Sequence, residues 1–179
     1  MLPVALALAI VVLDQVTKQL ALQLPRGQRV PVIGDFMTWQ LSFNSGAAFS
    51  LGNSATWIFT AIAAAAVVVI PILLLRKTTS LSARLIGAMI WGGAAGNLID
   101  RLLRDPGFPN GHVVDFINYN GWFIGNVADI FLVLALIALI VMQLLPNAAI
   151  KKVDSDVTDE TNGESAHNGV IGKTGEEPK

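Results

Sequence analysis

The sequence predicts an all-α integral membrane protein, built as a bundle of four transmembrane helices. Hydrophobic residues make up 53% of the 179 residues, the mean hydropathy is +0.59, and only 14% of the residues are charged. Soluble globular domains carry about 25% charged residues. A bilayer requires roughly 20 apolar residues per helix, and four windows satisfy this: about 2–22, 55–75, 81–99 and 124–145.

The first window, 2–22, can also be interpreted as a cleaved signal peptide. Such a peptide begins with a basic stretch and has an uninterrupted apolar centre. Here no basic residue precedes the apolar run, and Asp14 and Lys18 interrupt it. Because these two residues are four positions apart, they face one side of a helix. We therefore predict a permanent transmembrane helix with a structural ion pair inside the bundle.

The second and third windows each contain a residue pattern that concerns helix packing. Window 55–75 has no charge but includes Pro71, which is tolerated where neighbouring helices satisfy the backbone. In window 81–99, Gly92 and Gly96 are four positions apart, and such small residues let two helices approach closely. The third helix is therefore expected to pack tightly.

Polar residues gather at one end of the predicted bundle. Asn97, Asp100 and Arg101 end the third helix at positions i, i+3 and i+4, which share one helical face. The loops at the same end and the first turn of window 124–145 add further polar residues, namely Asn44, Asp115, Asn126 and Asp129. Ionisable residues in or beside transmembrane helices are a functional-site hypothesis by default.

Each of these residues also has a purely structural interpretation. Asn126 and Asp129 form N-x-x-D at a helix start, a variant of the capping box, and an aspartate there suits the helix dipole. Arg101 and Arg104 could extend to lipid headgroups. Asp100 is harder to explain, because an acid at a helix C-terminus opposes the dipole. We expect it to pair with Arg101 or Arg104.

The composition excludes several kinds of chemistry. There is no cysteine, and the net charge of −1 gives no indication of nucleic-acid binding. One histidine, His112, lies outside the tail, and neither H-E-x-x-H nor G-x-S-x-G occurs. No metal or cofactor is therefore expected. Two aspartates held close together share one proton, so one can activate water while the other polarises a carbonyl. Asp115 and Asp129 are the candidates.

Two other classes remain open from the residues alone. A small proton-coupled transporter would place carboxylates near the membrane midplane, often with internal repeats. Here the carboxylates gather at one interface, and no repeat is visible. A structural membrane protein would tolerate neutralisation of Asp115 and Asp129 together. The residues favour an enzyme over both alternatives.

The charge distribution predicts an orientation. Four spans place both termini on one side, together with Arg76, Lys77, Arg84, Lys151 and Lys152. The positive-inside rule then indicates cytoplasmic termini. Residues 151–179 carry four lysines against seven acidic residues and almost no large apolar residue. We predict a disordered acidic cytoplasmic tail after a single membrane domain, 1–150.

Five stretches, in order along the chain, resemble lipoprotein signal peptidase, the bacterial type II signal peptidase. They are LDQVTK (13–18), FNSGAAFS (43–50), GGAAGNLIDR (92–101), VVDF (113–116) and NVADI (126–130). The resemblance covers about residues 5–145. It implies an aspartic endopeptidase of the bacterial cytoplasmic membrane with its active site near the outer face. Such an enzyme removes signal peptides from diacylglyceryl-modified prolipoproteins, cutting before the lipidated cysteine.

The resemblance also implies roles for individual residues. The catalytic pair is Asp115 and Asp129; the substrate-binding residues are Asn44, Asn97, Arg101 and Asn126; the structural polar residues are Asp14, Lys18 and Asp100. The family fold adds a small extracytoplasmic β-cradle, which fits the β-formers in 30–43 with a turn at Gly34-Asp35. The expected partners are lipidated prolipoproteins and membrane lipid, and the chain is expected to act as a monomer.

Two departures from the family pattern concern the catalytic pair. Many relatives have phenylalanine before the asparagine of N-x-A-D, where this chain has Gly125. The stretch between the two aspartates is also shorter than in many relatives. The first departure is expected to loosen packing at the pair, and the second to shorten the segment that covers the site.

Overall fold

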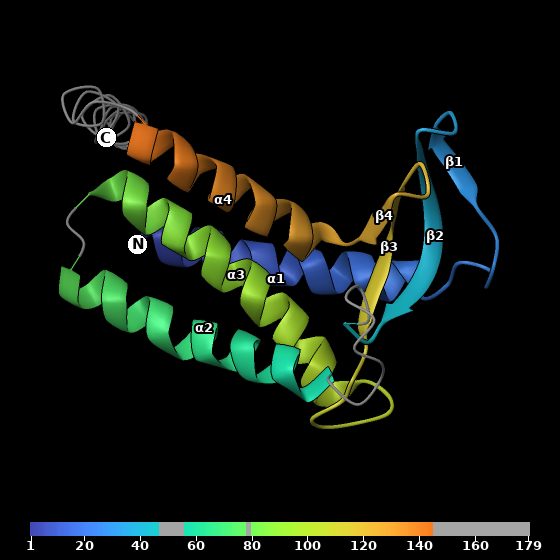
Figure 1. Cartoon of the computed structure of the whole chain (residues 1–179), viewed down its shortest axis with the longest axis horizontal. Helices are drawn as coiled ribbons and strands as arrows, with labels where there is room; N and C mark the ends of the chain where they lie inside the picture. Colours follow the sequence, from blue (N-terminus) through green and yellow to red (C-terminus); the bar gives the residue numbers. More distant parts are fainter. Residues whose placement is uncertain (47–55, 78–79, 145–179) are drawn as a thin grey trace, which may run out of the picture.

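A computed structural model describes residues 1–46, 56–77 and 80–144, which form four helices with a small sheet at one end (Figure 1). The predicted tail, 151–179, lies outside the described residues. The helices are α1 (Leu2–Ala21), α2 (Thr56–Lys77), α3 (Leu81–Leu103) and α4 (Val127–Leu144). The strands are β1 (Val30–Ile33), β2 (Met37–Asn44), β3 (Val113–Tyr119) and β4 (Phe123–Gly125).

Each predicted window contains one helix. Among the described residues, three helices are long and apolar enough to cross a membrane: α1, residues Thr56–Leu74 of α2, and α4. Helix α3 is as long as these but less apolar, because it combines charged residues with several glycines. The last window was predicted to begin at 124, which is wrong, because residues Phe123–Gly125 form a strand and the helix begins at Val127.

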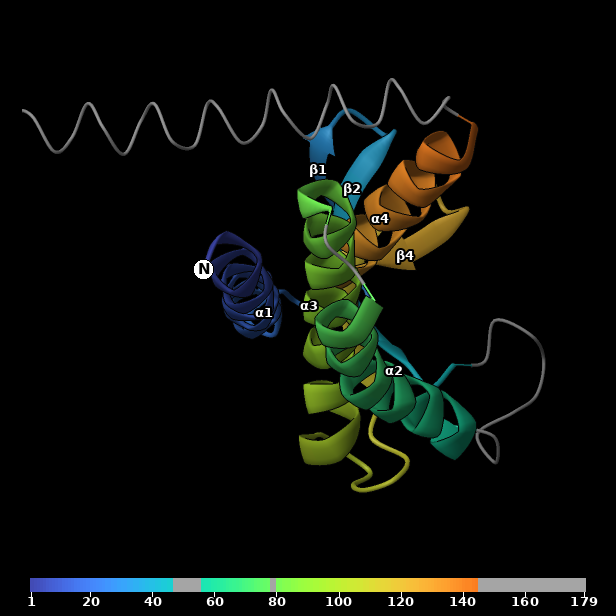
Figure 2. The ribbon, with the colours of Figure 1, turned by 90° about the vertical axis from the view of Figure 1, so that its left-hand side faces the viewer.

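Helix α3 lies between the others, with α1 on one side and α2 and α4 on the other (Figure 2). Its glycines explain how the backbones approach. A Cβ added at Gly92 would lie 2.9 Å from Ile10 Cβ and 3.0 Å from the Ala7 carbonyl oxygen of α1. A Cβ at Gly93 would lie 2.9 Å from the Ala128 carbonyl oxygen of α4. The predicted close packing of the third helix is confirmed.

Pro71 lies inside α2 and leaves one backbone acceptor without its usual donor. Proline has no N–H, so the carbonyl four residues earlier, that of Val67, loses its intrahelical hydrogen bond. The indole Nε1 of Trp91 on α3 donates to this oxygen at 2.9 Å. A neighbouring helix thus satisfies the backbone at the proline, as the sequence predicted.

The sheet is antiparallel with strand order β1-β2-β3-β4. The predicted turn at Gly34 and Asp35 is confirmed, because it joins β1 to β2, and Gly34 has a φ of 53°. Strands β3 and β4 were expected to be loop and helix, which is wrong. Residues Val113–Asn118 of β3 are all buried, so the strand lacks the alternation of polar and apolar residues by which half-buried strands are predicted.

Candidate active site

Asp115 lies on β3 rather than in a loop, opposite Ser42 of β2, and only 2% of its surface is exposed. Both carboxylate oxygens accept hydrogen bonds from asparagine side chains. Asn44 Nδ2, at the end of β2, donates to Oδ2 at 2.9 Å. Asn126 Nδ2 donates to Oδ1 at 2.6 Å. The strand pairing and the two amides define the position of this carboxylate.

Asp129 lies in the first turn of α4, where the predicted capping box is confirmed. Its Oδ2 accepts from the backbone N–H of Asn126 at 3.1 Å, and its own N–H donates to Asn126 Oδ1 at 3.1 Å. Asn97 Nδ2 of α3 donates to Asp129 Oδ1 at 2.9 Å. Asn126 therefore forms hydrogen bonds with both Asp115 and Asp129, and this shared partner brings the two residues together.

The surroundings of Asp115 favour its protonated form. Burial raises the pKa of this carboxyl to about 7, and the nearby negative charge of Asp129 acts in the same direction. The hydrogen bonds from Asn126 and Asn44 oppose the rise without cancelling it. Asp129 lies at a helix N-terminus, which stabilises a negative charge. The site thus holds two neighbouring carboxyl groups in different environments.

Lys18 is the centre of a buried charge cluster beside the two aspartates. Its Nζ is 2.8 Å from Asp14 Oδ2 and 2.9 Å from Asp100 Oδ2, and all three side chains are fully buried. The predicted ion pair within α1 is confirmed. Nζ also donates to Asn97 Oδ1 at 2.8 Å. Arg104 Nε, 2.6 Å from Asp100 Oδ1, provides the cationic partner that was expected from Arg101 or Arg104.

The two aspartates of this cluster bind the backbone immediately before each candidate catalytic residue. Asp100 Oδ2 accepts from the N–H of Val114 at 3.1 Å, next to Asp115. Asp14 Oδ1 accepts from the N–H of Ala128 at 2.9 Å, next to Asp129. Sequence reasoning missed both contacts, because a backbone N–H has no signature in a sequence. The cluster positions β3 and the start of α4 relative to each other.

Gln15 is a further residue that sequence reasoning missed. Its Nε2 donates to the Gly96 carbonyl oxygen at 3.0 Å and to Asp14 Oδ2 at 3.2 Å. A Cβ at Gly96 would lie 2.6 Å from Asp14 Oδ2, so the glycine makes room for that carboxylate. The position of Gln15 within the quoted stretch LDQVTK was the available signal.

Arg101 has a donor that no described residue uses. The side chain is 7% exposed, and its guanidinium lies 5.5 Å from the centroid of the Phe59 ring. Within the described part of the chain, the buried Nη1 has no hydrogen-bond partner. Its charge also acts on Asp115 and Asp129. A buried donor of this kind usually has a partner.

Gly125 was predicted to loosen the packing beside the two aspartates, which is wrong. A Cβ at this position would lie 2.5 Å from Phe123 Cε1 and 2.9 Å from Asp129 Oδ2. The Phe123 ring, two residues earlier on β4, fills the space in front of Gly125. The glycine is therefore required for the close approach of this ring and of the Asp129 carboxylate.

An apolar hollow of about 300 Å³ opens beside Asp129. It lies between β3, β4 and α4, and its lining residues are Tyr119, Phe123, Asn126, Asp129, Ile130, Val133 and Leu134. Elsewhere in the described residues, as here, no group of three or more His, Cys, Asp or Glu side chains is placed to hold a metal ion. The geometry supports two things: proton transfer by the two carboxyl groups, and binding of an apolar chain in the hollow beside them.

Comparisons with known proteins identify relatives of this chain. The model of the family described as signal peptidase (SPase) II matches residues 6–145. A lipoprotein signal peptidase of Mycobacterium avium is 47% identical over 141 residues, covering 78% of this chain and 77% of that protein. One from Bifidobacterium adolescentis is 40% identical over 163 residues, covering 90% and 86%. A solved bacterial membrane enzyme superposes with a TM-score of 0.69 at 30% identity, covering 81% of this chain and 93% of the other.

Proposed function

This chain belongs to the signal peptidase II family, and from that premise we propose how its residues carry out the cleavage. It is an integral cytoplasmic membrane peptidase that removes signal peptides from prolipoproteins. The transporter interpretation has no support from the comparisons. The substrate we propose is a prolipoprotein already modified with diacylglycerol, cut before the lipidated cysteine.

The catalytic type we propose is aspartic, with Asp115 protonated and Asp129 ionised in the resting site. The observation that carries this assignment is that both carboxyl groups bind Asn126 while burial raises the pKa of Asp115 to about 7. A carboxyl group that keeps its proton near neutral pH can donate it to a substrate carbonyl.

The proposed reaction needs no covalent intermediate. Asp129 takes a proton from water, and the resulting hydroxide attacks the scissile carbonyl carbon. Asp115 donates its proton to the carbonyl oxygen, giving a neutral tetrahedral diol. The C–N bond then breaks as Asp129 returns its proton to the leaving nitrogen and Asp115 takes one from a diol hydroxyl. Both carboxyl groups end in their starting states.

The four residues that were expected to bind substrate separate into two groups. Asn44, Asn97 and Asn126 bind the carboxylates in this structure, so we assign them the positioning of the pair. Arg101 Nη1 has no partner among the described residues, so we assign it a carbonyl oxygen of the substrate backbone. The apolar hollow beside Asp129 would take apolar residues of the signal peptide.

We also propose that all four helices cross the membrane, with both termini cytoplasmic and the pair near the outer face. Helix α3 would cross with its polar residues against its neighbours, because Asp100 and Arg101 are buried in the bundle. We also propose that the chain acts as a monomer. Arg76 near the end of α2 and Arg84 in the first turn of α3 support the orientation.

The test is cleavage of a lipidated prolipoprotein by purified Asp115→Asn and Asp129→Asn enzymes. We expect each to lose at least about a thousandfold in kcat, because each removes an obligatory proton transfer. Asn118→Ala is a matched control, since this buried residue of β3 binds Gln40 rather than the pair. If either aspartate variant folds and cleaves at a near wild-type rate, the aspartic mechanism is wrong.

A further inference from the structure

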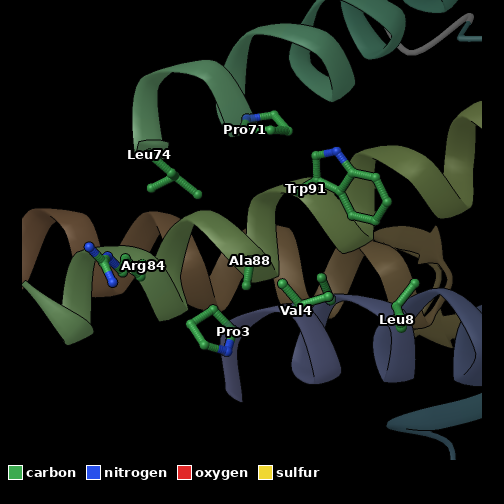
Figure 3. A pocket seen from close by; sticks show the side chains of 9 residues that line it. Pro3, Val4, Leu8, Pro71, Leu74, Arg84, Ala88 and Trp91 are labelled. Carbon is green, nitrogen blue, oxygen red and sulfur yellow. The ribbon is translucent and has the colours of Figure 1, made fainter. Parts of the chain in front are cut away.

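An apolar groove lies at the end of the bundle opposite the active site (Figure 3). Its walls are α1 and α2, and its floor is α3. It contains two overlapping cavities of about 250 and 410 Å³. Both are lined by the same five residues, which are Pro3, Val4, Pro71, Leu74 and Arg84.

The groove follows from the way the helices pack. Helices α1 and α2 each pack on α3 rather than on one another, so their facing sides are left apart. Ala88 forms a low floor, and the Trp91 contact to Val67 places the Pro71 segment of α2 beside it. Leu74 of α2 comes close to α3 at Gly87, which has no side chain. A Cβ added at Gly87 would lie 2.6 Å from Leu74 Cδ1.

Most of the lining is apolar, and Met1 also lines the larger cavity. Arg84, in the first turn of α3, is the charged residue that lines both cavities, and it is exposed. Figure 3 shows it at one end of the groove, beyond Leu74 and Ala88. An apolar channel that ends at a cation matches an acyl chain with an anionic headgroup.

The same charge argues against the substrate as the occupant. A secretory signal peptide begins with a basic stretch, which Arg84 would repel. A zwitterionic lipid gains less from the site than an anionic one, because its own ammonium group offsets the attraction of its phosphate. Among membrane components, an anionic phospholipid satisfies both the apolar wall and the cationic end.

We propose that this groove binds one anionic phospholipid, with an acyl chain between α1 and α2 and its phosphate against Arg84. In the orientation proposed above, this end faces the cytoplasmic leaflet; that placement rests on the proposed function, but the binding itself does not. The bound lipid would fill the gap between two helices that have little contact with each other.

The test measures lipid retention rather than peptide cleavage, so its outcome is independent of the catalytic proposal. The purified full chain in detergent is titrated with dioleoyl phosphatidylglycerol or dioleoyl phosphatidylcholine, and bound lipid is counted by native mass spectrometry. We expect one tightly held phosphatidylglycerol. Arg84→Gln should weaken it about fivefold, the usual effect of one basic residue near a lipid headgroup. Arg76→Gln is the matched control for a nearby arginine outside the cavity lining.

Two variants test the groove itself. Val4→Trp fills it from an exposed position on α1, and Ala88→Leu fills it from the floor. Both should reduce retention of either lipid while prolipoprotein cleavage in detergent continues. Equal binding of the two lipids, or equal losses in Arg84→Gln and Arg76→Gln, would overturn the headgroup assignment. Full retention in the folded Val4→Trp variant would overturn the groove.

Discussion

The two ends of the helix bundle are built in different ways. At the end that holds the candidate active site, hydrogen bonds and ion pairs of 2.8 to 3.1 Å connect Asp14, Lys18, Asn97 and Asp100. These contacts reach the backbone beside Asp115 and Asp129. At the opposite end, α1 and α2 diverge around an apolar groove. Directional contacts define positions closely, whereas apolar contacts tolerate a gap that lipid can fill. Side-chain positions are therefore most closely defined at the end of the bundle where the proposed chemistry depends on them.

The largest loss of stability is expected from a substitution in the buried charge cluster. Lys18→Met leaves Asp14 and Asp100 buried without their shared cation, and breaking a buried ion pair costs about 3–5 kcal/mol. We expect a large fall in the unfolding temperature, measured by tryptophan fluorescence in detergent. Val4→Ala, at the groove end, should cost less than about 1 kcal/mol, because this side chain is 64% exposed. Similar falls for both variants would refute the contrast.

A smaller effect is expected where the glycine meets the pair. Gly125→Ala places a methyl group 2.9 Å from Asp129 Oδ2, so this carboxylate must shift from its position. We expect kcat to fall on the order of tenfold, with little change in unfolding temperature, because the Phe123 ring is exposed enough to move. Adding Phe123→Ala should recover part of the loss, and a wild-type kcat in Gly125→Ala would contradict the close approach.

The pH dependence sharpens the description of the polar end. If Asp115 must be protonated, kcat/KM should fall as the pH rises through about 7, the value to which burial raises its pKa. Asn44→Ala removes a hydrogen bond that lowers this pKa, so the falling limb should move to higher pH. Asn118→Ala should leave the limb in place. A limb that moves to lower pH in Asn44→Ala would reverse the proposed roles.

The smallest expected effect lies at the groove end. Trp91→Phe removes the donor to Val67, and hydrogen bonds between transmembrane helices are worth about 0.6 kcal/mol on average. Pro71→Ala restores a helical donor for the same carbonyl, so Trp91→Phe should cost less in that background. Unfolding temperatures of the four proteins in this cycle measure the difference. Equal costs in both backgrounds would show that the indole contributes only packing.

The parts of the structure that could be predicted are those with a regular sequence pattern. Apolar runs predicted the helices, and the turn at Gly34 predicted the first hairpin. The spacing of Asn97, Asp100 and Arg101 predicted one polar face of the third helix. Strand β3 gave no pattern, because its burial on both faces removes the polar alternation. The positions of Val114 and Ala128 were beyond prediction, since backbone donors are the same in every residue except proline. Gly125 became interpretable only with the Phe123 ring in place.

The hydrogen bond from Ala128 to Asp14 joins the last helix to the first, and it has a consequence for how the protein is made. The ribosome completes α1 long before α4, so Asp14 enters the membrane without the partners that α3 and α4 later provide. Lys18, one turn along the same helix, neutralises it in the meantime. The proposed catalytic pair, by contrast, cannot come together until α4, which carries Asp129, has been made and inserted. The first helix is thus neutralised early, whereas the candidate site is completed late.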